Sequence, residues 1–180
     1  QDLVFGGRGD WFALAIEVRL PEGLAKQLER KRFEEANKKD KALLQKNPER
    51  ASGSLRYELA FRVNDNAVGI MQEHLFLLPR DRKLVGNTSE GLWGDTGLYN
   101  HAVVQRVISR TSDGVSLLEP EVGKRSEPQR ANMPTSTPAL SGAPVDLGQF
   151  GATDWLRNYL GRDVLPVGLN LAAMREPQRP

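Results

Sequence analysis

Cysteine and several motifs that mark common protein classes are missing from this 180-residue chain. It has no cysteine, which excludes disulfides and thiolate metal sites. No apolar run approaches the roughly 18 residues of a membrane-spanning helix, and the first residues lack a basic-then-apolar signal pattern. We therefore expect a soluble, cytoplasmic protein that does not bind a membrane.

Catalytic motifs are missing as well. The chain contains no G-x-x-x-x-G-K-[ST] phosphate loop, no paired acidic metal site and no H-E-x-x-H. Its two histidines, His74 and His101, are isolated in predicted strands, so we expect no metal site. The chain opens at Gln1 without an initiator Met, and we expect it to be a piece of a larger protein. Any enzymatic activity would then depend on catalytic groups outside it.

Alternating apolar residues predict an antiparallel sheet. The predicted strands are residues 11–20, 55–63, 67–78, 83–85, 101–110, 115–119 and 163–171. A charged helix is predicted over 22–46, and a short helix near 155–160 is capped by Thr153 or Asp154. These elements predict an α+β fold. It combines a mostly antiparallel sheet of about five to seven strands, a protruding charged helix and a C-terminal helix–strand unit.

Three parts are expected along the chain. Residues 1–119 form the β-rich lobe with its helical insert at 22–46, and residues 150–180 form the returning helix–strand unit. Between them, residues 120–149 have few large apolar side chains, and residues 120–146 contain five prolines. That composition predicts an irregular or partly disordered linker.

The cleanest alternation, over 55–63, predicts which side chains are buried. The inward set is Leu55, Tyr57, Leu59, Phe61 and Val63, and the outward set is Arg56, Glu58 and Arg62. Glu73 is expected at the sheet surface or an interface. The three tryptophans are expected to anchor either the core or the packing between lobes: Trp11, Trp93 and Trp155.

A Gly-rich loop precedes the first strand. In Phe5-Gly6-Gly7-Arg8-Gly9-Asp10, Gly7 lets backbone N–H groups approach a phosphate, and Arg8 could donate charge-assisted hydrogen bonds to it. The alternative is an ordinary turn that leads into a strand. The sequence of the loop leaves both interpretations open.

The predicted helix is the most basic part of the chain. Residues 21–50 hold nine Lys and Arg against six Asp and Glu. Its clustered cations could follow a nucleic-acid backbone: Arg30, Lys31, Arg32, Lys38 and Lys39. Acidic residues interrupt them, so the alternative is a solvated helix with intrahelical salt bridges.

Three segments together resemble the nucleotide-binding head of ABC-class P-loop ATPases of the RecF, SMC and overcoming-lysogenization families. DLVFGGRGDWFALAIEVRLPE (2–22) resembles the segment after the Walker A helix. SLRYELAFRVNDNAVGIMQEHLFL (54–77) resembles the following hairpin, and DWLRNYLGRDVLPVGLNLAAMREP (154–177) resembles the helix and strand that return to the core. Walker A would precede Gln1, and the signature motif and Walker B would follow Pro180.

The resemblance implies the β-rich lobe of an ATPase head that helps enclose ATP and acts in DNA maintenance or defence. ATP and Mg²⁺ would bind only in the full-length protein. The implied partners are the remaining lobe with Walker A and Walker B, a second head in a head-to-tail homodimer, and DNA. Arg8 resembles an arginine-bearing loop near the nucleotide, and Asn170 lies where such heads carry the Q-loop, with Asn in place of Gln. The alternative is a non-enzymatic module that binds nucleic acid or protein.

Overall fold

The fold is α+β and is built on one antiparallel sheet. A computed structural model describes residues 11–64, 67–85, 103–110, 114–122, 128–144 and 148–162. Six strands form the sheet: β1 (Trp11–Arg19), β2 (Ser52–Asn64), β3 (Ala67–Pro79), β4 (Gln105–Arg110), β5 (Val115–Leu118) and β6 (Gln129–Asn132). The α-helices are α1 (Glu22–Glu35), α2 (Lys38–Lys46), α4 (Ala139–Gly142) and α5 (Gly151–Arg162). Short 3-10 helices are η2 (Pro48–Arg50) and η3 (Arg82–Val85).

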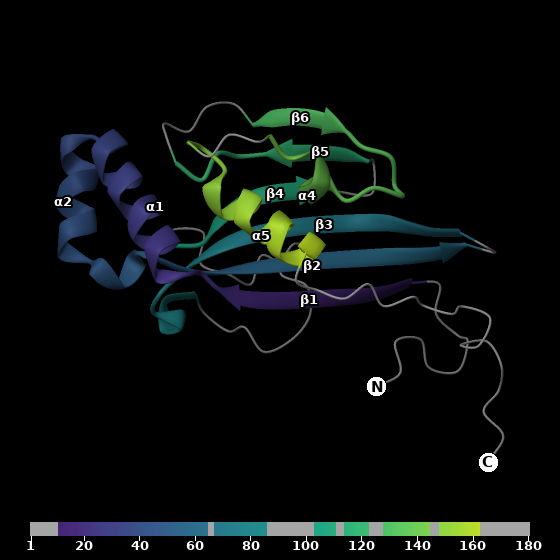
Figure 1. Cartoon of the computed structure of the whole chain (residues 1–180), viewed down its shortest axis with the longest axis horizontal. Coiled ribbons are helices and arrows are strands. Elements are labelled where there is room, and N and C mark those ends of the chain that lie inside the picture. The colour runs from purple at the N-terminus through teal and green to yellow at the C-terminus, as the bar shows by residue number, and fades with distance from the viewer. Residues whose placement is uncertain are drawn as a thin grey trace, which may run out of the picture.

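The strands follow one another across the sheet in chain order, from β1 to β6, and every neighbouring pair is antiparallel (Figure 1). Short connections between β2 and β3 and between β4 and β5 favour antiparallel pairing of those strands. Gly114 precedes β5 with φ of 80°, a conformation that glycine adopts without steric strain. The predicted β2–β3 hairpin is confirmed, and its register places Tyr57 opposite Leu75.

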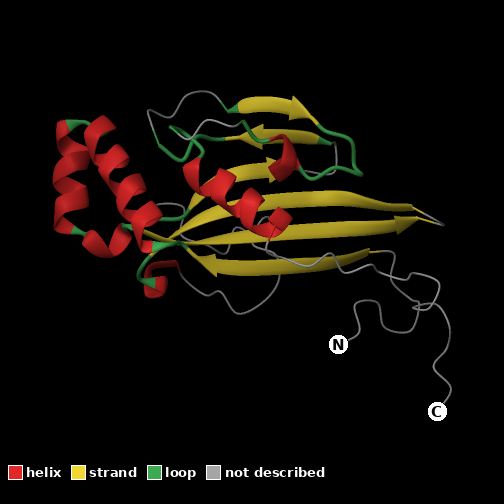
Figure 2. Cartoon of the chain, viewed as in Figure 1, coloured by secondary structure: helices red, strands yellow, loops and turns green. Residues whose placement is uncertain are grey.

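The predicted helix over 22–46 is divided. Ala36 takes an extended conformation (φ −66°, ψ 144°), so α1 ends at Glu35 and α2 begins at Lys38. The two helices form a hairpin beside one end of the sheet (Figure 2). The fully buried side chains of α1, Ala25 and Leu28, lie in its first half.

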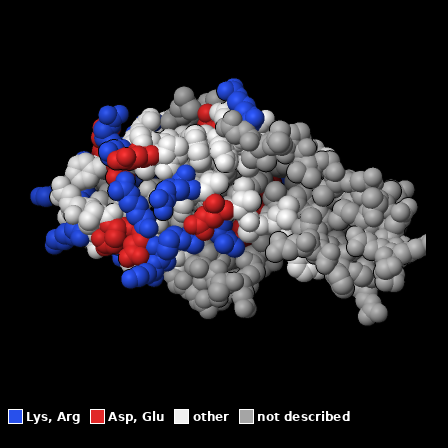
Figure 3. Space-filling model, turned by 60° about the horizontal axis from the view of Figure 1, so that its bottom comes forward, with Lys and Arg blue, Asp and Glu red and all other residues white. Residues whose placement is uncertain are grey.

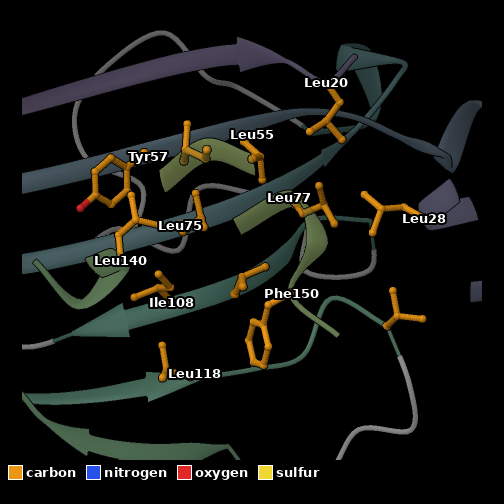
Figure 4. Close-up of a cluster of buried hydrophobic side chains, with 14 of the residues drawn as sticks. Leu20, Leu28, Leu55, Tyr57, Leu75, Leu77, Ile108, Leu118, Leu140 and Phe150 are labelled. Atoms are coloured by element: carbon orange, nitrogen blue, oxygen red, sulfur yellow. The ribbon is translucent and has the colours of Figure 1, made fainter. Parts of the chain in front are cut away.

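One face of the sheet carries the main core. α5, α4 and the start of α1 pack on it, and the buried side chains meet between them and the strands (Figure 4). This core includes Leu20, Leu28, Leu55, Tyr57, Leu75, Leu77, Ile108, Leu118, Leu140, Phe150 and Leu156. The other face holds a smaller cluster of Phe76, Leu78, Val85 and Val104.

Residues 120–149 differ from the irregular linker that the sequence predicted. They contain edge strand β6 and the short helix α4, and Ala139 and Leu140 are part of the main core. Residues 82–85 likewise form a 3-10 turn instead of a strand. The Asp81 carboxylate accepts a hydrogen bond from the Lys83 N–H at 2.9 Å, which favours the turn.

One burial prediction on β2 is wrong. Glu58, expected outside, is fully buried, and its Oε1 lies 2.7 Å from Nε of Arg56. Trp11, expected to anchor the core or the packing between lobes, is 53% exposed and therefore does not belong to the core. Arg62 is exposed as predicted, whereas Phe61 is only half-buried and stacks on Phe12 with ring centroids 4.9 Å apart. Among the described residues, no helix has the length and apolar character needed to cross a membrane.

Candidate functional site

Three predicted site residues lie outside the described residues: Gly7, Arg8 and Asn170. The same holds for His101, for Trp93 and for the strand predicted over 163–171. The site can therefore be built from three parts of the described structure. These are the basic helical hairpin, two buried carboxylates on the core side of the sheet, and the side of the sheet formed by β1.

Arg32, one of the predicted nucleic-acid contacts, is directed into the molecule. Its Nε donates to the carbonyl of Glu121 at 3.1 Å, and its Nη1 donates to Oγ of Ser52 at 2.9 Å. Its Nη2 donates to Oε1 of Gln105. Burial lowers the pKa of Arg32, and the nearby Glu121 charge opposes that shift. Arg32 thus fastens α1 to the starts of β2 and β4.

The other predicted basic residues differ in exposure. Lys31 is half-buried and donates from Nζ to the Gly148 carbonyl at 3.5 Å. Arg30 is exposed, with Nε 3.7 Å from the Glu34 carboxylate, and Lys38 is also exposed at the start of α2. Lys39 follows it in α2. Basic and acidic side chains are mixed over the helical end of the molecule (Figure 3), which disfavours a continuous cationic track.

The sequence suggested that Glu73 lies at the sheet surface or an interface, and this prediction is wrong. Glu73 is a buried hydrogen-bond acceptor. Its Oε1 accepts from the Tyr57 hydroxyl at 2.7 Å and from the Leu140 N–H at 2.8 Å, and its Oε2 accepts from the Ala139 N–H at 2.6 Å. Burial raises the pKa of Tyr57 well above its ordinary value, and the Glu73 charge adds to the shift. Glu73 therefore holds the start of α4 against the sheet.

Arg110 balances the Glu73 charge. Both side chains are fully buried, and Arg110 Nη1 lies 3.8 Å from Glu73 Oε2. The guanidinium also donates to three carbonyl oxygens, each at 2.7 Å, of Met133, Pro134 and Thr137. The pair thus fixes the Pro-rich segment before α4 from the inside, and its donors and acceptors serve structure.

A second buried carboxylate caps the start of α5. Glu121 accepts from the backbone N–H of Ala152 at 2.8 Å and from both the N–H and the hydroxyl of Thr153 at 2.6 Å. The helix cap predicted at Thr153 or Asp154 is therefore supplied from a distant part of the chain. Burial raises the pKa of Glu121, while the Thr153 and Ala152 hydrogen bonds oppose the rise.

Parity along the strand could have placed Glu73 correctly. Glu73, Leu75 and Leu77 are two residues apart, so their side chains share a face. The apolar pair marks that face as core. For Glu121 the sequence offers no comparable signal, because the residues that it caps, Ala152 and Thr153, are about 30 residues away and no sequence pattern links them to Glu121.

The described residues bring together no set of metal ligands. No three His, Asp or Glu side chains there could hold a metal ion. Two hollows lie on α1. One of about 110 Å³ is lined by Leu24, Gln27, Leu28, Lys31 and Gly151, and the other lies among Gly23, Lys26, Gln27 and Arg30. Their linings contain cations but no carboxylate, so neither offers the paired groups of acid–base catalysis.

Of the five large apolar side chains that are exposed among the described residues, three lie on β1. Leu14 is 40% exposed and Ile16 is 38% exposed, although their cross-strand partners Leu59 and Tyr57 place them on the face that carries the core. α5 lies over the middle of that face, and none of the described helices crosses β1 (Figure 1). On α5, Tyr159 is 37% exposed.

At the margin of the main core, side chains of β1, β2 and α5 are only partly buried. Val18 of β1, Leu59 of β2 and Trp155 of α5 all pack at the margin of the main core. Trp155 stacks on Tyr159 with ring centroids 5.4 Å apart. We call Leu14, Ile16 and Tyr159 the open side of the core. Large apolar side chains exposed beside a packed core are typical of an interaction surface.

Comparison with known proteins gives no match: no protein-family model, no curated protein and no solved structure is similar to this chain.

Proposed function

We propose that this chain is the β-rich lobe of an ABC-class ATPase head of the RecF and SMC kind. Its open side packs against the remaining lobe, which carries Walker A and Walker B. In this role the lobe helps to enclose ATP and supports closure of two heads in DNA maintenance or defence. The chain contributes shape and cations, and the groups that hydrolyse ATP belong to the other lobe.

The observation that carries this proposal is the open side of the core. A domain of this size normally covers its core face, and large exposed apolar side chains on that face favour a permanent neighbour. Leu14, Ile16 and Tyr159 are each more than a third exposed beside a well-packed core. A second lobe of the same head would cover them.

The arrangement of the three resembling segments also supports the proposal. Segment 2–22 contains β1, segment 54–77 contains most of β2 and β3, and segment 154–177 begins within α5. β1 and β3 flank β2, and α5 packs on the same sheet. Segments separated by about 80 residues are therefore neighbours in one compact unit, as the parts of one lobe should be.

In this proposal Arg8 and Asn170 belong to the nucleotide side of the lobe, and ATP with Mg²⁺ binds only when both lobes are present. Phosphoryl transfer requires backbone N–H groups and a Lys around the phosphates, and acidic groups that place Mg²⁺ and water. This chain lacks those motifs. Its contribution would be Arg8, which can donate charge-assisted hydrogen bonds to phosphate.

The alternative, a nucleic-acid-binding module that needs no ATP, receives less support. Arg32 is committed to internal hydrogen bonds, and Arg30 lies near Glu34. DNA contact within the ATPase head would still be possible through Lys38 and Lys39 of α2.

The coding sequence on either side of this segment tests the proposal. A phosphate-loop motif in frame before Gln1, and a Walker B motif after Pro180, would support it. A reading frame that encloses these residues with neither motif, together with no ATP binding by its product, would contradict it.

A further inference from the structure

The two edges of the sheet are built differently, and the difference identifies what covers β1. β6 is a short edge of four polar or small residues, Gln129–Asn132, with Arg130 exposed. β1 is a long edge of nine residues that contains neither Lys nor Pro. Natural edges are protected by short length, Lys, Pro or bulges, and β6 follows that rule whereas β1 does not.

β1 is also regular. It pairs with β2 through nine consecutive residue pairs, from Trp11 opposite Arg62 to Arg19 opposite Ser54, without a register shift. In an antiparallel strand, N–H groups point alternately toward the partner and away from it. Among the described strands, β1 has one neighbour, so its other side presents a straight row of backbone donors and acceptors.

Exposed apolar side chains lie on both sides of this row. Leu14 and Ile16 project on the core face, and Trp11, which is 53% exposed, projects on the opposite face. Added strands bind such edges through main-chain hydrogen bonds and gain specificity from alternate side chains. A helix would cover Leu14 and Ile16 but would leave the row of backbone groups without partners.

The geometry points to a β-strand of the remaining lobe as the occupant, and we propose that it extends the sheet beside β1. This inference rests on the proposed function and specifies how the two lobes meet. The incoming strand is amphipathic. Its apolar side chains continue the row of Leu14 and Ile16, and its other face, beside Glu17 and Arg19, is polar.

The size of the surface favours this occupant over a second copy of the chain. Trp11, Leu14 and Ile16 together expose on the order of 300 Å² of side chain, given the 150–250 Å² of a whole aromatic side chain. Stable complexes bury about 800 Å² on each partner. A strand joined to the rest of the same head binds at a high effective concentration and does not need that area.

Residue-resolved amide exchange by NMR distinguishes these cases. Residues 1–180 alone should show protection at alternate amides of β1, where N–H groups point to β2. In the complete polypeptide that contains this lobe, all amides from Phe12 to Val18 should be protected, with slowing of at least about tenfold for those that face outward. β6 provides an internal control, because its alternation should be unchanged.

Alternation at β1 that persists in the complete polypeptide would overturn the inference. Protection that disappears on dilution would assign the edge to a second copy and would also overturn it. All β1 amides could be protected, independently of concentration, in a complete polypeptide that has no Walker motifs. That result would support the added strand and reject the ATPase assignment. Failure of the inference and failure of the proposed function therefore give different results.

A paired substitution provides a second readout. Leu14→Lys places a charge where the added strand would lie, and it should restore rapid exchange of the outward amides in the complete polypeptide. Asn132→Lys on β6 is the matched control and should leave exchange at β1 unchanged. If Leu14→Lys leaves the outward amides protected, the added strand is excluded.

Discussion

Arg110→Met should destabilise this protein more than any surface substitution, because it breaks a buried ion pair and three hydrogen bonds together. Arg110 lies 3.8 Å from the Glu73 carboxylate and donates to the carbonyl oxygens of Met133, Pro134 and Thr137. Removal of one partner of a buried pair typically costs about 3–5 kcal/mol, since the other charge is left uncompensated. A domain of this size loses about 2–4 °C of Tm per kcal/mol, so the expected fall is roughly 6–20 °C.

Urea unfolding followed by circular dichroism measures the effect, with Arg62→Met as the matched control on an exposed side chain. That control should change the free energy of unfolding by less than about 0.5 kcal/mol. The double variant Glu73→Gln, Arg110→Met should be less destabilised than the sum of the single variants, by about 0.5–3 kcal/mol. Equal losses for Arg110→Met and Arg62→Met, or simple additivity in the double variant, would refute this account of the network.

Three further outcomes are expected. Because the pKa of Tyr57 is raised in the folded protein, the free energy of unfolding should fall as the pH rises above about 10; Tyr57→Phe should remove that fall, which alkaline urea titrations measure. Because the pKa of Glu121 is also raised in the folded protein, its ionisation should lower the free energy of unfolding as the pH rises from about 4.3. Thermal melts in the acid range measure this dependence, and Glu121→Gln should make it flatter. A wild-type dependence of opposite sign would contradict the reasoning. Under the proposed function, Arg8→Ala in the complete polypeptide should weaken ATP-dependent dimerisation or turnover roughly ten- to a hundredfold at unchanged Tm, and equal ATP titrations would reject its role.

Local patterning predicted most of the sheet. The alternation over residues 11–20 and 55–78 predicted β1, β2 and β3 as strands, and the turn between the last two predicted their hairpin, because one face of each strand meets the core. Glu58 shows where the rule fails. Its face of the sheet also buries Phe76 and Leu78, so a charged residue on that face need not be exposed.

Long-range contacts account for the other differences. The Pro-rich stretch looked irregular because its order comes from Arg110 and Glu73, which hold its backbone from β4 and β3. The break at Ala36 carries no Gly or Pro, and its local signal is Asn37, a residue type that favours the N-cap position just before α2. Of the predicted site, sequence placed Arg30 and Lys38 at the surface correctly, but Arg32 finds its hydrogen-bond partners only in the folded chain.

Phosphate release from ATP tests the central claim most directly. The complete polypeptide encoded by the reading frame around this segment should hydrolyse ATP in the presence of Mg²⁺, while purified residues 1–180 should release phosphate no faster than a buffer blank. Turnover by residues 1–180 that a substitution within them abolishes would contradict the account, as would a complete polypeptide that neither binds nor hydrolyses ATP.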